Sequence, residues 1–566
     1  MEKKTVRKIA VMLMLGVMAP LAANAADVDL QLKIDSLSKE VADLKGSVKR
    51  VEDKSIGKWL TIGGDYRFRV DSLHGETVGY TNAPAFMGAL QKDPAFTNFF
   101  ANPQTQGLLS TTSYAGVATL TPNAMMGNLM GYLMAPTASG GQGLTQAAAG
   151  ALLQQLGGGA FVPAYKPKNE TLYTNKFGLD LHAKATQDVT VNVKLDMYKS
   201  FGSQSDTATT GNYFADRIGV FDGTLGHVPS SGLLNVDRAY ATWSNIAEQP
   251  AWFSVGRRPS TNGAPSNLKL NNERPGNGGT PALLVDYAFD GMTLGYAPDI
   301  DMLSGAYAKA CYGRGFDSGF KTSSNSIKDT DMLGVAIIPV DTDPLRVWLQ
   351  WNRGFNIFDF PVMNNTAAFG TTAPSVNLGD IDWYGAGAMS TIKNFGPGNL
   401  NFFTDFGVSI THPNDTVSAN AGFQGLGTGG FLAPEVPSDK TGWAVYAGIR
   451  YDLPSKTKIG FEFNHGSKDW ITFAPASDDM WTSKVGVRGN VYEPYIIQEL
   501  DLKPISSYFA KAFFKIGYQY YDFEYTGSNN WVGAPVKISS IQASDMLLLA
   551  PVKTAHDVYA TFEVKF

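Results

Sequence analysis

The sequence of 566 residues is short of cysteine, histidine and charge. Its single cysteine, Cys311, excludes a disulfide framework, and without a Cys-x-x-Cys-His motif there is no c-type haem attachment site. The six histidines show no metal-ligand spacing, so we expect no metal and no cofactor. Gly-x-Ser-x-Gly, His-Glu-x-x-His and Walker motifs are also absent, and we expect no enzyme and no catalytic residue.

Charge and long apolar runs are scarce as well. Charged residues make up 17% of the chain, below the roughly 25% of soluble domains, and residues 94–165 contain no Asp, Glu, Lys, Arg or His. After the N-terminal segment, no apolar run is long enough to cross a membrane as a helix. Aromatic residues reach 12%, yet the mean hydropathy is only -0.12. This composition favours a transmembrane antiparallel β-barrel, in which outward apolar and inward polar residues cancel. A secreted soluble β-protein is the alternative.

The N-terminus predicts export. Basic residues in the first eight positions precede the apolar stretch 9–21, and Ala23-Asn24-Ala25 follows. This layout predicts a signal peptide over residues 1–25, with Ala26 as the mature start. An uncleaved anchor is less favoured because the stretch is shorter than the roughly 20 residues of a span. We therefore expect an outer-membrane location in a Gram-negative-type bacterium, and no nucleic-acid partner.

A heptad pattern comes after the signal peptide, in a predicted periplasmic module of residues 26–54. From Leu30 to Val51 the apolar residues are spaced alternately by four and three positions, which places them at the a and d positions of a coiled coil. A lone helix of this length is marginal in water. The pattern therefore predicts self-association as a dimer or trimer, with a helix docked on another surface as the alternative.

Alternating strands predict a barrel over residues 55–566. In residues 59–72, Ile62, Tyr66 and Phe68 alternate with residues that include Arg67 and Arg69. An arginine facing lipid near the midplane costs about 2–4 kcal/mol, so both arginines are expected to face the lumen. Short turns, including Asp290-Gly291, alternate with long loops. About 16 strands (14–18) are predicted, at 59–72, 171–185, 189–199, 234–244, 251–259, 282–289, part of 292–313, 330–338, 345–353, 380–392, 400–411, 441–452, 457–466, 484–494, 506–523 and 555–566.

The lumen is predicted to be mixed in charge. Its inward cations could line an anion path, to which one of Arg257 and Arg258 could add, whereas salt bridging that stiffens the wall is the alternative. The candidate cations are Arg67, Arg69, Lys176, Lys184, Lys194 and Arg450.

The uncharged run lies in a predicted first external loop, residues 73–170. Thr121-Pro122 opens a predicted helix, and residues 144–160 predict a second one that Gly157 to Gly159 close. We expect this hairpin to constrict or cap the barrel; helices packed only on each other and on neighbouring loops, or an apolar patch for a ligand or protein, are the alternatives. The candidate constriction residues are Met125, Met126, Leu129, Met130, Leu133 and Met134.

The closing strand ends on an aromatic residue. In "HDVYATFEVKF", Phe562, Val564 and Phe566 share one face. This ending is similar to the terminal signal that the outer-membrane assembly machinery recognises in its barrels.

Several segments carry a resemblance to known families. The layout, with "IGGDYRFRV", "FSVGRRPSTNG" and the closing Phe, is similar to porins with an N-terminal periplasmic coiled coil. The segments "FEFNHGSKDW", "VGVRGNVYEPYIIQ" and "YDFEYTGSNNWVGAPVKI" resemble DUF3373, an uncharacterised family of bacterial outer-membrane proteins. The resemblance implies a barrel in a membrane, but no substrate and no functional residue.

Two functions of different classes remain open at this point. The first is a porin-like channel for passive diffusion of small polar or anionic solutes, narrowed by the first external loop. The second is a non-conducting structural or interaction protein that displays its loops and is tethered through its coiled coil. Outer-membrane lipid is a partner in both.

Overall fold

The structure is a computed structural model. It describes residues 40–41, 45, 59–101, 122–202, 233–259, 265–272, 283–323, 326–366, 370–418, 424–430, 435–474, 479–501 and 510–566. The predicted signal peptide lies outside these residues, as does all of the predicted coiled coil except Glu40, Val41 and Lys45, so both stay predictions. The chain divides into Met1–Thr61 and Ile62–Phe566, and the second unit holds nearly all of the described residues.

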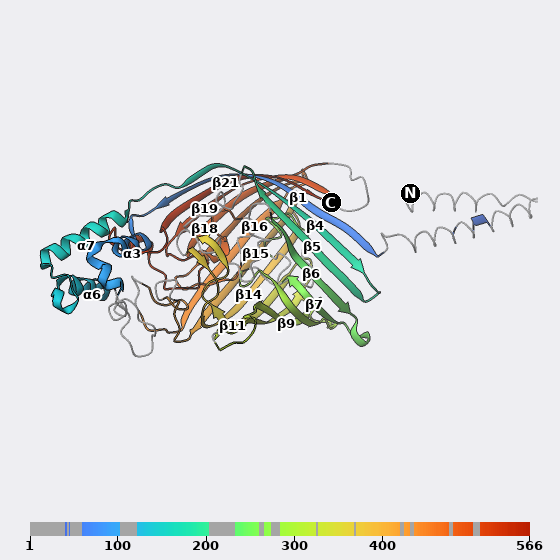
Figure 1. Cartoon of the computed structure of the whole chain (residues 1–566). Coiled ribbons are helices and arrows are strands. Elements are labelled where there is room, and N and C mark those ends of the chain that lie inside the picture. The colour runs from blue at the N-terminus through green and yellow to red at the C-terminus, as the bar shows by residue number, and fades with distance from the viewer. Residues whose placement is uncertain are drawn as a thin grey trace, which may run out of the picture. The chain divides into compact units, whose positions relative to one another are not determined.

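Sixteen antiparallel strands close into one barrel, which confirms the predicted antiparallel β-barrel and its strand number (Figure 1). Around the barrel the order is β1-β21-β19-β18-β17-β16-β15-β14-β11-β10-β9-β8-β7-β6-β5-β4. The strands are β1 (Leu60–Thr77), β4 (Lys168–Lys184), β5 (Val189–Ser200), β6 (Leu233–Ser244), β7 (Ala251–Pro259), β8 (Ala288–Tyr296), β9 (Tyr307–Phe316), β10 (Thr330–Asp341), β11 (Arg346–Phe358), β14 (Asn377–Phe395), β15 (Gly398–Pro413), β16 (Lys440–Asp452), β17 (Thr457–Gly466), β18 (Gly489–Glu499), β19 (Lys511–Phe523) and β21 (Val552–Lys565).

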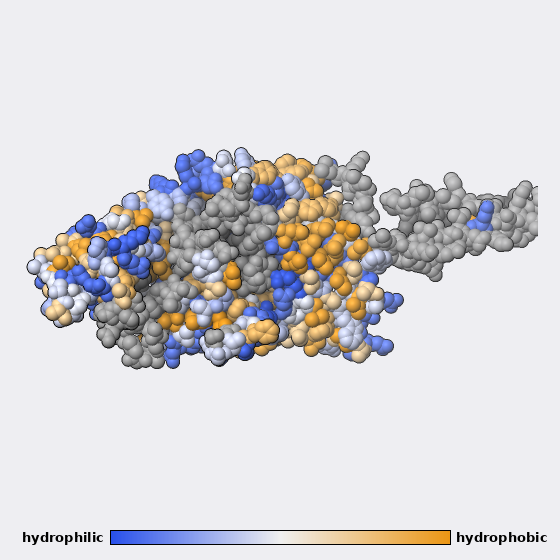
Figure 2. All heavy atoms as spheres, viewed as in Figure 1, coloured by the Kyte–Doolittle hydropathy of each residue, from blue (hydrophilic) through white to orange (hydrophobic). Residues whose placement is uncertain are grey.

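The two faces of the wall differ as the alternation in the sequence predicts. Outward residues are apolar and exposed, for example Ile62, Leu294 and Ile516, at 61%, 58% and 62%. Inward residues between them are buried, for example Arg67 and Arg69 on β1. Figure 2 shows the resulting apolar area over the barrel wall. Such a surface is stable only where something other than water covers it.

One predicted turn is wrong. Asp290 and Gly291 lie inside β8, where Gly291 pairs with Gly256 of β7 and Gly313 of β9. Pairing on both sides overrides the local turn preference of Asp-Gly. The short connection comes later, at residues 297–306, and 283–287, predicted as strand, precede β8 without belonging to it. The other predicted short turns join the same strand pairs, with small shifts at their ends.

Several helices and short strands do not belong to the barrel wall. The α-helices are α3 (Ala83–Lys92), α4 (Thr97–Ala101), α6 (Pro122–Met134) and α7 (Gln146–Ala160), and the short strands are β2 (Tyr80–Asn82), β3 (Phe161–Val162), β12 (Met363–Thr366), β13 (Gly370–Thr372) and β20 (Met546–Leu547). Single 3-10 turns occur at Pro94–Phe96, Thr137–Ser139, Ile246–Glu248, Lys484–Gly486 and Ile538–Ser540. Among the described residues, no helix has the length and hydropathy needed to cross a membrane.

The helices form a small core of their own. Phe86, Phe99, Leu129 and Leu153, from α3, α4, α6 and α7, are buried together. Thr145 caps α7 by accepting a hydrogen bond from the backbone N–H of Ala148, at 3.3 Å. The helix includes the glycines at 157–159 and ends at Ala160, which is the last residue of the predicted helical segment. Figure 1 shows α3, α6 and α7 beyond one end of the barrel strands.

Candidate functional site: the lumen of the barrel

The lumen is the candidate site, because charged side chains from most strands meet there. Arg69 on β1 donates to Asp71, at 2.6 Å, and to Asp557 on β21, at 2.9 Å. The arginine also lies over the ring of Tyr559, 4.4 Å from its centroid. A buried charge needs such partners to offset its lost hydration. The charge of Arg69 is therefore largely balanced by these two carboxylates on the inner face of the wall.

The other predicted lumen cations divide into paired and exposed ones. Lys194 lies 3.1 Å from Asp65, and Lys176 lies 3.3 Å from Asp196. Arg450 binds Asp452 at 2.7 Å. Arg67 is buried on the inward face of β1, and Lys184 is exposed at the end of β4. The predicted alternative of salt bridging within the wall thus describes most of these residues.

Two connections, whose residues were predicted partly as long loops and partly as strand, fold back inside the barrel. We call them the lumen insert: residues 265–272 and 283–287, between β7 and β8, and residues 470–474 and 479–488, between β17 and β18. The two connections contact each other, since Val285 forms a β-bridge with Phe473 and the Asp286 N–H donates to the Phe473 carbonyl at 2.8 Å. The insert therefore behaves as one packed body.

The insert reaches the end of the barrel where the short turns lie. Arg450 donates to the Leu268 carbonyl at 2.5 Å, and Lys565 donates to the Leu270 carbonyl at 2.7 Å. Lys458, on the second residue of β17, donates to Asn271 at 2.6 Å. Each of these three donors lies within three residues of a short connection or of the C-terminus. Residues 265–272 of the β7–β8 connection therefore lie toward the end of the barrel opposite to the one where β7 ends.

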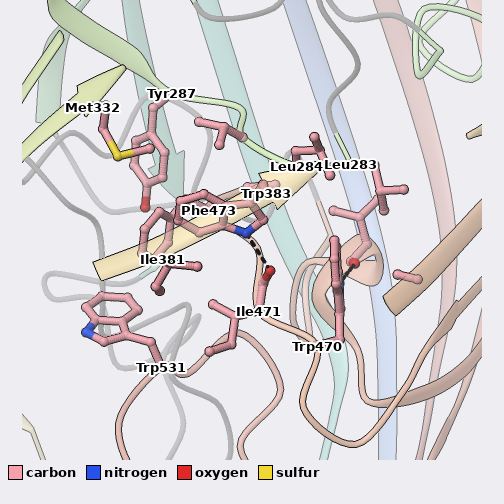
Figure 3. Packing of buried hydrophobic residues seen from close by; sticks show 14 of the residues in the cluster. Leu283, Leu284, Tyr287, Met332, Ile381, Trp383, Trp470, Ile471, Phe473 and Trp531 are labelled. Atoms are coloured by element: carbon pink, nitrogen blue, oxygen red, sulfur yellow. Dashed lines mark hydrogen bonds between the residues drawn. The ribbon is translucent and has the colours of Figure 1, made fainter. Parts of the chain in front are cut away.

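Aromatic packing fixes the middle of the insert (Figure 3). Trp383 of β14 is fully buried, lies 4.9 Å from Phe473 between ring centroids, and donates its indole N–H to the Ile471 carbonyl at 2.8 Å. Trp470 donates to the Val485 carbonyl at 2.8 Å. Each buried indole N–H thus has an acceptor, as burial requires.

Glycines on the wall make room for this packing. A Cβ added to Gly407 of β15 would lie 2.7 Å from a methyl carbon of Leu284 and 2.8 Å from the ring of Trp470. A Cβ at Gly385 of β14 would likewise lie 2.7 Å from Leu284. An inward glycine on a strand marks close approach of another segment. This is the sequence signal that could have located the insert.

Buried ion pairs tie the insert to β17 and β18. Lys269 lies 2.7 Å from Glu493 and 3.1 Å from Asp479, and Lys484 lies 2.6 Å from Glu493 and in contact with Glu462. All five side chains are nearly inaccessible to solvent. Two carboxylates of the wall therefore face two ammonium groups of the insert.

The helices predicted to constrict the barrel make different contacts. Leu129 and Leu133 are fully buried among the other helices, Met130 packs against the same cluster, and Met134 is 41% exposed. The side chains of Met125 and Met126 lie outside the described residues. The described helices therefore pack on each other and on Met546 of β20, whereas the insert packs inside the lumen against the wall around β14.

A cavity of about 420 Å³ remains beside the insert, on the inner wall of β6–β9. We call it the β6–β9 cavity. Arg258 of β7 and Lys309 of β9 line it, together with hydroxyl-bearing Thr242, Ser254 and Thr293. None of the described residues that line it is Asp or Glu. This described lining thus carries positive charge and hydroxyl groups, with no carboxylate to repel an anion.

Of the two cations that line this cavity, the sequence predicted a candidate only for Arg258. Arg258 stands in the Arg257-Arg258 pair, of which one member was expected inside; Arg258 is the inward one, and Arg257 lies 3.3 Å from the exposed Asp290. Lys309 was not singled out because residues 292–313 contain Pro298 and gave no clear strand register.

The fold and the lumen place the protein in the class of closed 16-stranded antiparallel barrels. Its lumen holds a packed insert and a cationic cavity. The chain belongs to the family described as "Protein of unknown function (DUF3373)", whose profile matches residues 166–566. The resemblance noted in the sequence is therefore confirmed. No curated protein matches the sequence.

Solved structures with a similar architecture are outer-membrane proteins. The high-pH structure of Pseudomonas putida OprB is 12% identical, covers 93% of this chain and 97% of its own, and has a TM-score of 0.39. The anion-selective porin from Comamonas acidovorans is 10% identical over 89% of this chain and 99% of its own, with a TM-score of 0.35. The outer-membrane channel DcaP of Acinetobacter baumannii is 10% identical over 91% and 99%, also at 0.35. The likeness concerns the fold alone.

Proposed function

We propose that this protein is a porin-like channel of the outer membrane that passes small polar or anionic solutes by passive diffusion. The solute path runs along the β6–β9 side of the lumen. The lumen insert narrows the pore, in place of the helices between β1 and β4. The signal peptide and the recognition of Phe562, Val564 and Phe566 by the assembly machinery remain parts of this proposal.

The membrane location is supported by the outer surface of the barrel. Exposed apolar residues occur on strands all round the closed wall, for example Val255, Leu349, Ile449 and Val558. Lipid removes such side chains from water without a protein partner, and a closed barrel leaves no strand edge unpaired. The aromatic C-terminus is outward too, with Phe566 half exposed and its backbone paired with Gly64.

The β6–β9 cavity carries the functional part of the proposal. A wholly structural barrel has no need to leave about 420 Å³ of its interior open, or to place Arg258 and Lys309 there without a carboxylate among the described lining residues. Cations along a pore raise the local concentration of anions and lower the barrier to their passage. Among the other candidate cations of the lumen, Arg69, Lys176, Lys194 and Arg450 form ion pairs within the wall and have less effect on selectivity.

Planar-bilayer recording tests this proposal. Mature protein reconstituted from outer membranes is expected to give stepwise conductance, with a reversal potential in a salt gradient that indicates anion preference. Arg258→Gln should shift that potential toward cation preference. Lys393→Gln is the matched control, since Lys393 is an exposed cation 2.8 Å from Asp343 in the region of the β14–β15 turn.

The second candidate is a non-conducting barrel that serves as a scaffold for its loops and its predicted coiled coil. The observation that favours it is the insert, which crosses the lumen and is fixed by buried ion pairs. Electrical silence from protein shown to be folded, both in the native sequence and in a variant with a released insert, would decide for the scaffold.

A further inference from the structure

We propose that the β6–β9 cavity is a binding site for a small hydroxylated organic anion of the sugar-acid class. This inference rests on the proposed function and deepens it, because it names what the pore holds during passage. The carboxylate would bind the two cations, the hydroxyls would bind the hydroxyl-bearing wall, and the carbon skeleton would lie against Trp252.

The strand registers arrange these groups in rows. Thr242, Ser254 and Thr293 are successive partners across β6, β7 and β8, so their hydroxyls form a line across the inner wall. The Thr242 and Ser254 hydroxyls lie 2.8 Å apart. Hydroxyl groups both donate and accept, which suits a ligand that carries hydroxyls itself.

The next row holds no side chains. Gly256, Gly291 and Gly313 are partners on β7, β8 and β9, and all three occupy inward positions. Gly256 has φ +119°, a conformation that a larger residue rarely adopts. Beyond this row lies Arg258. The glycines let neighbouring groups approach closely, since a Cβ at Gly291 would lie 2.0 Å from the Tyr312 carbonyl oxygen and one at Gly313 would lie 2.5 Å from Cβ of Phe289.

Arg258 retains hydrogen-bonding capacity. Its side chain is nearly inaccessible, since its relative exposure is 6%. Nε has no hydrogen-bond partner among the described residues, and the bond from Nη1 to the Pro259 carbonyl is long, at 3.3 Å. A buried donor without an acceptor is costly, and a carboxylate is the acceptor that matches a guanidinium best.

Lys309 and Trp252 complete the site on the side nearest the short turns. Gly295 of β8 pairs with both of them, Trp252 on β7 and Lys309 on β9. A Cβ at Gly295 would lie 2.0 Å from the Trp252 ring, so the indole lies flat over the glycine. The ring of Tyr307 meets it edge-on, at 6.1 Å between centroids. A fixed aromatic face beside a cation suits the apolar side of a polyol chain.

Calorimetric titration of the full mature protein in detergent tests the site without requiring conduction. D-Gluconate is the probe, hexanoate is the acid of equal chain length without hydroxyls, and glucose is the uncharged comparison. We expect gluconate to bind, with hexanoate weaker and glucose undetected. Arg258→Met or Lys309→Met should weaken gluconate by about tenfold or more, since each removes a charge-assisted contact. Lys393→Met is the control and should leave binding unchanged.

A variant that lacks a wall hydroxyl tests whether the site recognises the hydroxyls of the ligand as well as its charge. Thr242→Val should weaken gluconate but leave hexanoate as it was. Arg258→Lys keeps the charge and should retain part of the affinity for gluconate. It replaces Arg258→Met in the titration if that variant fails to fold, as judged by heat-modifiable migration on gels. No binding of gluconate, or equal binding by the Arg258→Lys, Lys309→Met and native proteins, would overturn the site.

The two proposals fail differently. A protein that conducts but does not bind gluconate keeps the channel and loses the site. A protein that binds gluconate but never conducts keeps the site and loses the channel. Equal affinity for gluconate and hexanoate would overturn the assignment to hydroxylated acids.

Discussion

Two parts of the same wall meet the lumen in different ways. On β14 to β18, inward glycines accept the side chains of the insert, and inward carboxylates pair with its lysines. On β6 to β9, inward glycines also stand side by side, yet a cavity lies beside them with Arg258 and Lys309 at its lining. The strands pair antiparallel in both parts, although β14 to β16 have 13–19 residues and β6 to β9 have 9–12.

The difference shows that the wall alone does not determine what the lumen does. Insert side chains cover the inward glycines Gly385 and Gly407, whereas the backbone of the next strand and Phe289 lie closest to Gly291 and Gly313. Where the insert lies, we expect substitutions to change stability together with conductance. Where the cavity lies, we expect them to change conductance and selectivity with little change in stability.

The largest effect is expected where the insert is tied by charge. Glu493→Gln removes the carboxylate that lies 2.7 Å from Lys269 and 2.6 Å from Lys484. Removing one partner of a buried ion pair costs about 3–5 kcal/mol, although Asp479 and Glu462 stay in contact with the two lysines. Urea titration should show a loss of this size in the free energy of unfolding, and single-channel conductance should rise as the insert is released.

The control for this change is Asp343→Asn. Asp343 forms an ion pair of similar length with Lys393, at 2.8 Å, but both side chains are well exposed. Exposed pairs contribute within about 1 kcal/mol, so this variant should resemble the native protein. If Glu493→Gln also resembled the native protein in both measurements, the ion pairs would not be what holds the insert.

A smaller effect is expected at the end of the insert. Arg450→Met removes the donor to the Leu268 carbonyl and the partner of Asp452. Hydrogen bonds to charged groups contribute about 1.5–3 kcal/mol, and the loss should appear in the free energy of unfolding. Arg450→Lys is the comparison, and it should recover part of the stability because one charged donor remains. Equal stability of the native and methionine proteins would contradict this role.

One substitution made on both walls sharpens the comparison. Ser409 of β15 is fully buried and accepts from the Ile471 N–H at 3.2 Å, so Ser409→Phe has no room and should destabilise by about 1–3 kcal/mol or more. Ser254 lines the cavity. Ser254→Phe should therefore preserve stability and reduce conductance by about half or more, because pore width limits passage. Conductance is read from single channels and stability from urea titration. Equal losses of stability at both positions would remove the distinction between the walls.

The residues in these variants differ in how well their positions could be predicted from the sequence. The alternation around Arg67 and Arg69 predicts the direction of β1, since lipid tolerates only one face, and the same logic places Lys194 and Arg450 inside. The insert could not be predicted that way. Its lysine, Lys269, lies in a connection whose composition resembles an external loop, and its partner Glu493 is more than two hundred residues away in the sequence. Local patterns carry no information about such pairing.

The smallest effect is expected at the rim, away from both walls. In the β9–β10 connection, the Asp329 carboxylate accepts from the Ser318 hydroxyl at 2.6 Å and from its backbone N–H at 2.9 Å. These bonds hold the pKa of Asp329 below its ordinary value. Because the folded pKa is depressed, the stabilisation is present above the unfolded pKa of about 3.9 and is lost as the pH falls through the folded value. Asp329 should therefore protect the Ser318 amide from hydrogen exchange less at low pH than at pH 6, once the exchange rates are corrected for the intrinsic rate. Asp329→Asn should remove this difference, whereas a pH-independent contribution from Asp329 would show that its charge does not hold the loop.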